Sequence, residues 1–91
     1  MANVSITWRI MPSEADIDLT KIENQISETV SKFTGNNNIK FTVEPIAFGL
    51  KALKVMFVMD ENKNLEELED SVKVMENIAS VEAIDVRRML G

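Results

Sequence analysis

In some segments of the chain every second residue is hydrophobic, and in others the hydrophobic residues recur every three or four positions. This change of spacing limits the fold more than any other feature of the chain. Over residues 4–11 hydrophobic and mainly polar residues alternate, which predicts a half-buried strand that ends at Pro12. From Asp18 the hydrophobic residues recur every three or four positions, which predicts a helix with one apolar side. Asp18 is the expected N-cap, with Asp16 as the alternative, and Gly35 is the expected left-handed C-cap.

The second half of the chain repeats this pattern. Alternating residues predict two more strands, at 39–44 and 53–59, and the pair Asn64 and Glu67 resembles a capping box that opens a second helix. The hydrophobic stripe of this helix is expected to contain Leu65, Leu68, Val72, Met75 and Ile78. A last strand is expected over residues 81–90.

The resulting order is strand, helix, strand, strand, helix, strand. Two βαβ-like halves with right-handed crossovers give an α+β, ferredoxin-like βαββαβ sandwich, in which a four-stranded antiparallel sheet carries both helices on one face. Another α+β sandwich with a different strand order is the competing arrangement. Ninety-one residues suffice for one core, so we expect a single domain over residues 1–91.

The composition excludes most catalytic chemistry. The chain has no histidine and no cysteine, so the commonest general base, thiol nucleophiles and thiolate metal sites are unavailable. The acidic residues of the second helix lie off its hydrophobic stripe, which is typical of a solvated surface rather than of a metal site. The six methionines are scattered, which favours core packing over a soft-metal site. We therefore expect no enzymatic activity, no cofactor and no bound metal.

Charge and hydropathy limit the class of partner. The net charge of −5 argues against a nucleic-acid surface, which needs clustered Lys and Arg. The polar side of the first two strands also offers no aromatic ring on which bases could stack. No hydrophobic stretch approaches the length of a membrane span, and the first residues do not resemble a secretory signal. These features favour a cytoplasmic protein that binds another protein, rather than nucleic acid or a membrane.

The segment between the second and third strands, residues 43–55, is the most informative motif. Pro45 cannot donate to a sheet, so it belongs at a strand end or on an edge. Gly49 can adopt a positive φ without steric cost, and the aromatic Phe48 stands beside it. The ring could cap the core, which composition alone favours, or it could contact a partner.

This segment resembles the central segment of the elongation factor 1-beta family, the nucleotide exchange factors for elongation factor 1-alpha in archaea and eukaryotes. The resemblance covers essentially the whole chain, because the proline-containing loop at 11–19, the acidic helix at 65–70 and the last strand at 80–89 are also similar to parts of that family. At 91 residues the chain is similar to the short archaeal form.

The resemblance implies that the chain promotes exchange of GDP for GTP on elongation factor 1-alpha, the GTPase that delivers aminoacyl-tRNA to the ribosome. In eukaryotic members a lysine one residue from the carboxyl end reaches toward the partner's Mg²⁺ and phosphate site. The matching position here is Arg88, which three further residues follow. Under this interpretation the expected partner-binding residues are Arg88, Phe48, Arg87, Gly49 and Lys51.

The alternation of the last strand predicts which way its two arginines point. Arg88 is expected to share the core-facing side with Ile84 and Val86, whereas Arg87 points to the other side. An ordinary surface ion pair, with Glu82 or a helix carboxylate, is the alternative for Arg88. The alternative function is a small ferredoxin-like regulatory or ligand-binding domain that acts as an oligomer, whereas the exchange factor is expected to be monomeric when free.

Overall fold

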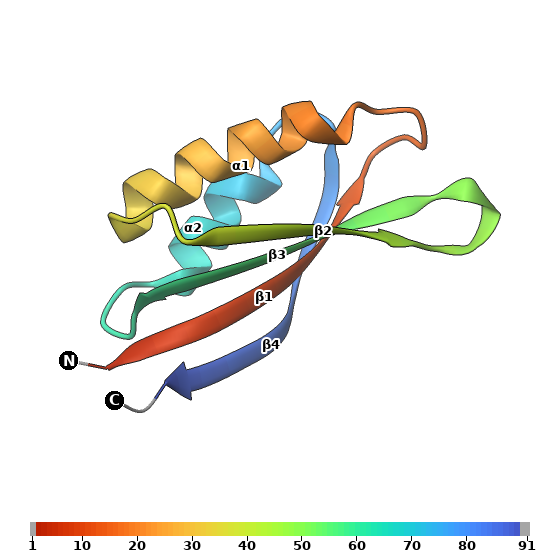
Figure 1. Ribbon diagram of the computed structural model, residues 1–91. Coiled ribbons are helices and arrows are strands. Elements are labelled where there is room, and N and C mark those ends of the chain that lie inside the picture. The colour runs from red at the N-terminus through yellow and green to blue at the C-terminus, as the bar shows by residue number, and fades with distance from the viewer. Residues whose placement is uncertain (1, 90–91) are drawn as a thin grey trace.

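The computed structural model describes residues 2–89 (Figure 1). Its strands and helices are β1 (Asn3–Pro12), α1 (Leu19–Thr34), β2 (Ile39–Pro45), β3 (Lys51–Asp60), α2 (Leu65–Lys73) and β4 (Ile78–Met89). Leu90, the last residue of the expected final strand, lies outside the described residues.

The strands form one antiparallel four-stranded sheet in the order β2-β3-β1-β4. Both helices cover the same face of this sheet, and the other face is uncovered (Figure 1). The ferredoxin-like βαββαβ prediction is therefore confirmed, and the competing strand order is wrong. In this topology β1 lies in the middle of the sheet, between β3 and β4.

The helix ends follow the predicted caps. The Asp18 carboxylate accepts a hydrogen bond from the Thr20 amide at 3.0 Å, which selects Asp18 over Asp16 as the N-cap of α1. Gly35 closes α1 in the left-handed region with φ 78°, and its amide donates to the Ser31 carbonyl at 2.8 Å. At the start of α2 the Asn64 side chain accepts from the Glu67 amide, as the capping box predicts.

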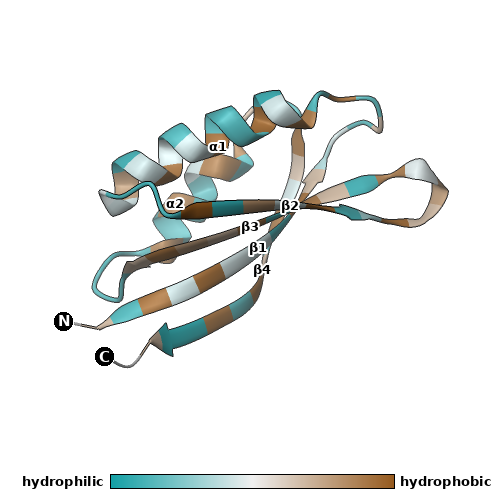
Figure 2. Cartoon of the chain, in the orientation of Figure 1, coloured by the Kyte–Doolittle hydropathy of each residue, from teal (hydrophilic) through white to brown (hydrophobic). Residues whose placement is uncertain are grey.

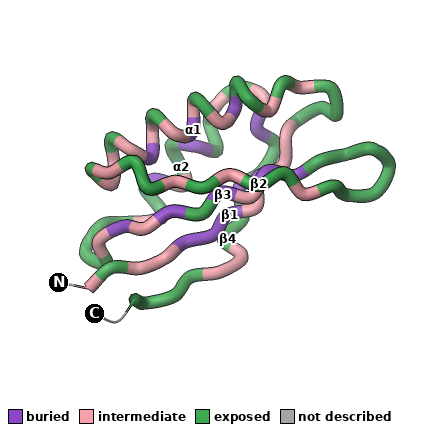
Figure 3. The backbone as a smooth tube through the Cα atoms, in the orientation of Figure 1, coloured by how far each residue is buried: buried purple, intermediate pink, exposed green. Residues whose placement is uncertain are grey.

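The hydrophobic core lies between the sheet and the helices. Trp8 of β1 is fully buried at its centre, and its ring meets that of Phe57 edge-on with 4.7 Å between the centroids. Figure 2 shows hydrophobic and polar residues alternating along β1, and Figure 3 shows the buried parts of β1 and β3. The other fully buried large side chains are Ile6, Ile10, Ile22, Ile26, Val30, Leu53, Val55, Leu68 and Val72.

The predicted boundary between α2 and β4 is wrong by several residues. α2 ends at Lys73, and Ile78, which was expected on the helix, is the first residue of β4. Asn77 ends the connection with φ 72°, and its carbonyl accepts from the Ser13 amide at 3.0 Å. The helical spacing continues past the helix because Met75 and Ile78 both pack against the same core from the connection and the strand.

The predicted orientation of Ile84 is also wrong. The register between β1 and β4 passes from Thr7 opposite Asp85 to Trp8 opposite Ala83, so Ile84 is the extra residue of a β-bulge. Ile84 therefore lines the uncovered face of the sheet, next to Thr7 and Asp85. Alternation alone cannot locate a bulge, since one inserted residue moves the side chains that precede it in the strand to the opposite face of the sheet.

The hydrogen bond between Trp8 and α2 gives a test of how the helix is held on the sheet. The indole N–H of Trp8 donates to the Glu69 carboxylate at 3.0 Å. Glu69→Ala leaves this buried donor without its partner, and we expect the free energy of unfolding to fall by about 1–2 kcal/mol. Glu66→Ala, on the exposed side of the same helix, should change it by less than about 0.5 kcal/mol. Urea unfolding followed by Trp8 fluorescence measures both, and equal effects of the two variants would contradict the proposed role of the bond.

Candidate functional site

The hairpin of β2 and β3 projects beyond the rest of the sheet. The two strands pair from Ile39 opposite Phe57 as far as Pro45 opposite Lys51. The pairing of β3 with β1 stops earlier, at Leu53 opposite Ile10. Figure 1 shows the end of this hairpin standing clear of the helices and of the other strands.

The tip of the hairpin is a tight turn that displays Phe48. The Ile46 amide donates to the Leu50 carbonyl at 2.7 Å, and the Leu50 amide donates to the Ala47 carbonyl at 3.3 Å. Phe48 (φ 64°, ψ 31°) and Gly49 (φ 77°) are both left-handed, the geometry of a type I′ turn. The Phe48 side chain is 99% exposed, so the interpretation that it caps the core is wrong.

The left-handed conformation of Phe48 lowers the stability of the fold, and no burial of its ring offsets that loss. A left-handed conformation for a residue other than glycine costs on the order of 1–2 kcal/mol, and a solvated ring gains no burial. Ile46 and Leu50 are also more than a third exposed, so the ring belongs to a small apolar tip. Lys51 follows the tip and lines a hollow between the hairpin and the β1–α1 loop, together with Asp16 and Ile17. An apolar tip with a neighbouring cation suits a protein partner better than a small-molecule substrate.

The two arginines of β4 point to opposite sides of the sheet, and both are paired. Arg87 lies opposite Ser5, on the uncovered face, and its Nε is 3.1 Å from the Asp85 carboxylate. Arg88 lies opposite Val4, on the side of the helices. Its Nε is 3.1 Å from Oε2 of Glu61. The alternative of a surface ion pair for Arg88 is therefore realised, with Glu61 and not with Glu82 or a helix carboxylate.

The structure separates the five predicted site residues into two groups. Phe48, Gly49 and Lys51 lie at the hairpin end, whereas Arg87 and Arg88 lie beside the start of β1, where Asn3 is opposite Met89. The described chain measures 42 × 21 × 19 Å, and the two groups occupy opposite ends of its long dimension (Figure 1). A partner that touches both must extend along most of the molecule.

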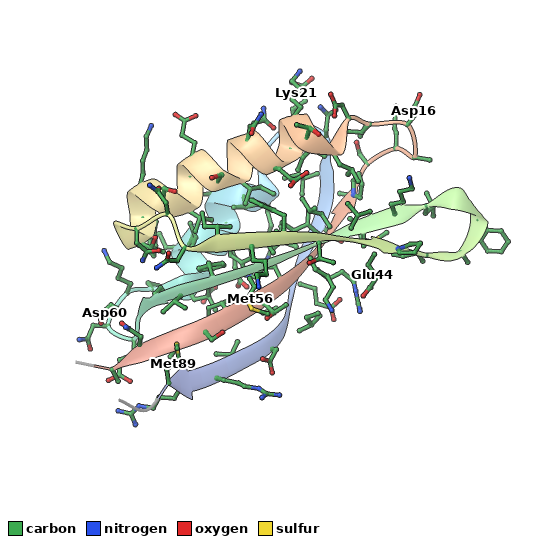
Figure 4. The ribbon with its side chains drawn as sticks, viewed as in Figure 1. Asp16, Lys21, Glu44, Met56, Asp60 and Met89 are labelled. Atoms are coloured by element: carbon green, nitrogen blue, oxygen red, sulfur yellow. The ribbon has the colours of Figure 1, made fainter. Side chains whose placement is uncertain are left out.

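The uncovered face carries features that the sequence did not identify. Glu44 of β2 lies within 3.2 Å of Arg9 on β1 and within 3.7 Å of Lys54 on β3, so one carboxylate bridges two cations. Met56 and Met89 are each 46% exposed on this face, and Figure 4 labels both. Only the register of the sheet shows these neighbours, because they lie on different strands, and Arg9 and Met89 come from opposite ends of the chain.

The described residues contain neither an acidic metal cluster nor a membrane-spanning helix. No group of three or more Asp or Glu side chains is placed to hold a metal ion within residues 2–89. No helix in that part of the chain is long and apolar enough to cross a membrane.

Comparison with known proteins defines the class to which this hairpin and sheet belong. Residues 5–89 match the family model described as the EF-1 guanine nucleotide exchange domain. Elongation factor 1-beta of Methanothermobacter thermautotrophicus is 37% identical over 91 residues, which are 99% of this chain and 100% of that protein. The elongation factor 1-beta proteins of Methanosphaera stadtmanae (33%; 99% of this chain and 100% of that protein) and Aeropyrum pernix (34%; 98% and 99%) are similar over the same extent.

The fold and the match define a guanine nucleotide exchange domain. The chain belongs to the elongation factor 1-beta family, as the resemblance of its central segment implied. Its role is therefore that of a nucleotide exchange factor in translation elongation, and this favours the exchange interpretation over a regulatory or ligand-binding domain.

Proposed function

We propose that the chain promotes release of GDP and uptake of GTP on elongation factor 1-alpha, regenerating the form that binds aminoacyl-tRNA. The match of residues 5–89 to the exchange domain carries this proposal. The exposed Phe48 tip supports it, because a strained and solvated aromatic ring is explained by contact with a partner. We further propose that the chain acts in the cytoplasm, and that it hydrolyses no nucleotide itself.

The proposed mechanism needs differential binding but no bond-breaking chemistry. GTPases hold nucleotide through Mg²⁺ and the phosphates. An exchange factor accelerates release only if it binds the nucleotide-free partner more tightly than the loaded one. A cation brought to the metal's ligands repels Mg²⁺ and pairs with the carboxylate that held it, which weakens the hold on the diphosphate. Arg88 is the residue to which we assign this role, with Arg87 secondary.

Under this proposal the Phe48 end and the Arg88 end of the molecule have different roles. The apolar tip around Phe48 anchors the factor on the GTPase, at a distance from the nucleotide. The Arg88 end acts at the nucleotide site. Because the two groups are joined by the hydrogen-bonded strands of one sheet, the anchor fixes where the arginine arrives.

The direct test of this function is nucleotide release in a purified system. The chain should accelerate dissociation of fluorescent GDP from elongation factor 1-alpha in a concentration-dependent manner, without producing inorganic phosphate from GTP when incubated alone. Unchanged dissociation at saturating factor would remove the exchange function. Phosphate release by the isolated chain would contradict the proposal that it is not an enzyme.

The anchoring role predicts a specific phenotype for Phe48→Ala. The ring contacts solvent, so we expect the thermal midpoint to remain within a few degrees of the original value, while partner affinity falls by about tenfold or more. Val74→Ala is a matched control, because Val74 is 83% exposed but lies after α2 and outside the hairpin. Calorimetric unfolding and binding titrations on both variants separate the effects. A stability loss of about 3–5 kcal/mol would instead indicate a buried ring.

The role of Arg88 predicts a loss of exchange rather than of folding. Arg88→Ala should lower the maximal rate of GDP release at least about tenfold, equivalent to about 1.4 kcal/mol of differential binding. The pair with Glu61 is at the surface, so the free energy of unfolding should change by less than about 1 kcal/mol. Arg88→Lys keeps the charge and should retain more activity than Arg88→Ala. A greater loss in Arg87→Ala than in Arg88→Ala would show that the other side of the strand carries the function.

A further inference from the structure

Glu61, the first residue after β3, holds the guanidinium of Arg88 through two contacts. The Arg88 Nε is 3.1 Å from Oε2 of Glu61, and its Nη2 donates to Oε1 at 3.3 Å. Both contacts use the same edge of the guanidinium. Arginine has five N–H donors, so this pair leaves three: one on Nη1 and one on Nη2 along the second edge, and one more on Nη1.

Glu61 is the less exposed partner of this pair, and its backbone is tied to the start of the sheet. The Glu61 amide donates to the Ala2 carbonyl at 3.2 Å, which ties the turn after β3 to the start of β1. Val4 of β1 pairs with Met59 of β3 on one side and with Arg88 of β4 on the other. Because Glu61 follows Met59 by two residues, its ion pair with Arg88 spans β1 and joins the strands on either side of it. The Glu61 side chain is 33% exposed and that of Arg88 is 65% exposed. Figure 4 shows Asp60, which precedes Glu61, at the same end of the sheet as Met89, which follows Arg88.

We propose that Glu61 is a positioning residue for nucleotide exchange. It binds one edge of the Arg88 guanidinium and leaves the second edge available for an acidic group at the partner's nucleotide site. This inference rests on the proposed function, and on the assignment of the acting cation to Arg88.

The physical gain comes from ordering Arg88 before the partner arrives. A long arginine side chain loses rotamer freedom when it binds, and a side chain already held in one orientation loses less. The opposite effect, in which Glu61 neutralises the cation and slows exchange, is weaker here because both side chains are partly exposed and water and salt screen their interaction. The two short contacts of the pair still give the guanidinium one preferred direction, so we expect removal of the carboxylate to slow exchange by a small factor.

Glu61→Gln tests this role because it removes the charge and keeps the shape of the side chain. In the release assay with fluorescent GDP and elongation factor 1-alpha, we expect the maximal rate at saturating factor to fall by about two- to fivefold. The half-saturating concentration should change little, because the anchor at Phe48 is intact. Glu28→Gln is the matched control: it removes one carboxylate from another surface pair, 3.1 Å from Lys32 on α1, and should leave the rate unchanged.

A double-mutant cycle separates positioning from a general effect of charge. If Glu61 acts through Arg88, then Glu61→Gln should have no further effect in the Arg88→Ala background. NMR of the arginine Nε–H groups gives a second measurement, because the Arg88 resonance should shift and exchange faster with water in Glu61→Gln than in the unaltered chain.

The outcomes distinguish the positioning role of Glu61 from the exchange function of the chain. An unchanged or faster rate in Glu61→Gln, or an equal loss in the Arg88→Ala background, would overturn the positioning role while leaving the exchange function in place. Failure of the unaltered chain to accelerate release would overturn the exchange function, and this role of Glu61 with it.

Discussion

The structure depends on the burial of β1 between two neighbouring strands. Trp8 fills the centre of the core from this strand, contacts Phe57 on β3 and donates its N–H to Glu69 on α2, so one side chain joins two layers. The polar end of the indole reaches a carboxylate at the edge of the core, which lets a large aromatic ring be buried without leaving its donor unpaired. The register of the strands on either side of Trp8 then determines which residues lie at each end of the sheet. At one end the β2–β3 hairpin extends beyond β1. At the other end Arg88 and Arg87 of β4 lie opposite Val4 and Ser5 of β1.

The two ends of the described chain differ in character: the hairpin tip has a strained backbone and an exposed ring, and the β4 end has ion pairs. At the hairpin tip the backbone conformation of Phe48 and the exposure of its ring both oppose stability. Neither is required by the turn, since a second glycine would adopt the same left-handed conformation without a Cβ. At the β4 end the cations are paired with carboxylates, and surface pairs of this kind contribute little to folding. Their orientation is more informative than their energy, because alternation sends Arg87 and Arg88 to opposite sides of the sheet.

The fold was predictable from the sequence because hydrophobic period, caps and turn residues agree with one another. Asp18, Gly35 and Asn64 each act where local chemistry places them. The errors have two sources: the hydrophobic period reports burial rather than hydrogen bonding, and it cannot locate a bulge. Ile78 continues the helical spacing from within a strand, and Ile84 keeps the strand alternation although a bulge has turned it to the uncovered face. The exposure of Phe48 was one of two alternatives that the sequence left open, and its role in binding stays a prediction. The contact between Glu61 and Arg88 could not be predicted from local patterns, because it joins residues 27 positions apart.

The proposed anchor and the proposed cation lie at opposite ends of one sheet, and this separation has a mechanical consequence. A flexible connection between an anchor and a cation would raise the local concentration of the cation but would not fix its direction. Paired strands fix both, since the distance between the ends is set by the number of residues in β3, which runs from the hairpin tip to the Arg88 end, and by the rise along a strand. The remaining freedom is that of the arginine side chain itself, and the fork with Glu61 removes part of it. Under this proposal the position of the cation is specified in two stages, first by the backbone of the sheet and then by one carboxylate at its end. The second stage is the one that we expect a single substitution to remove without unfolding the chain.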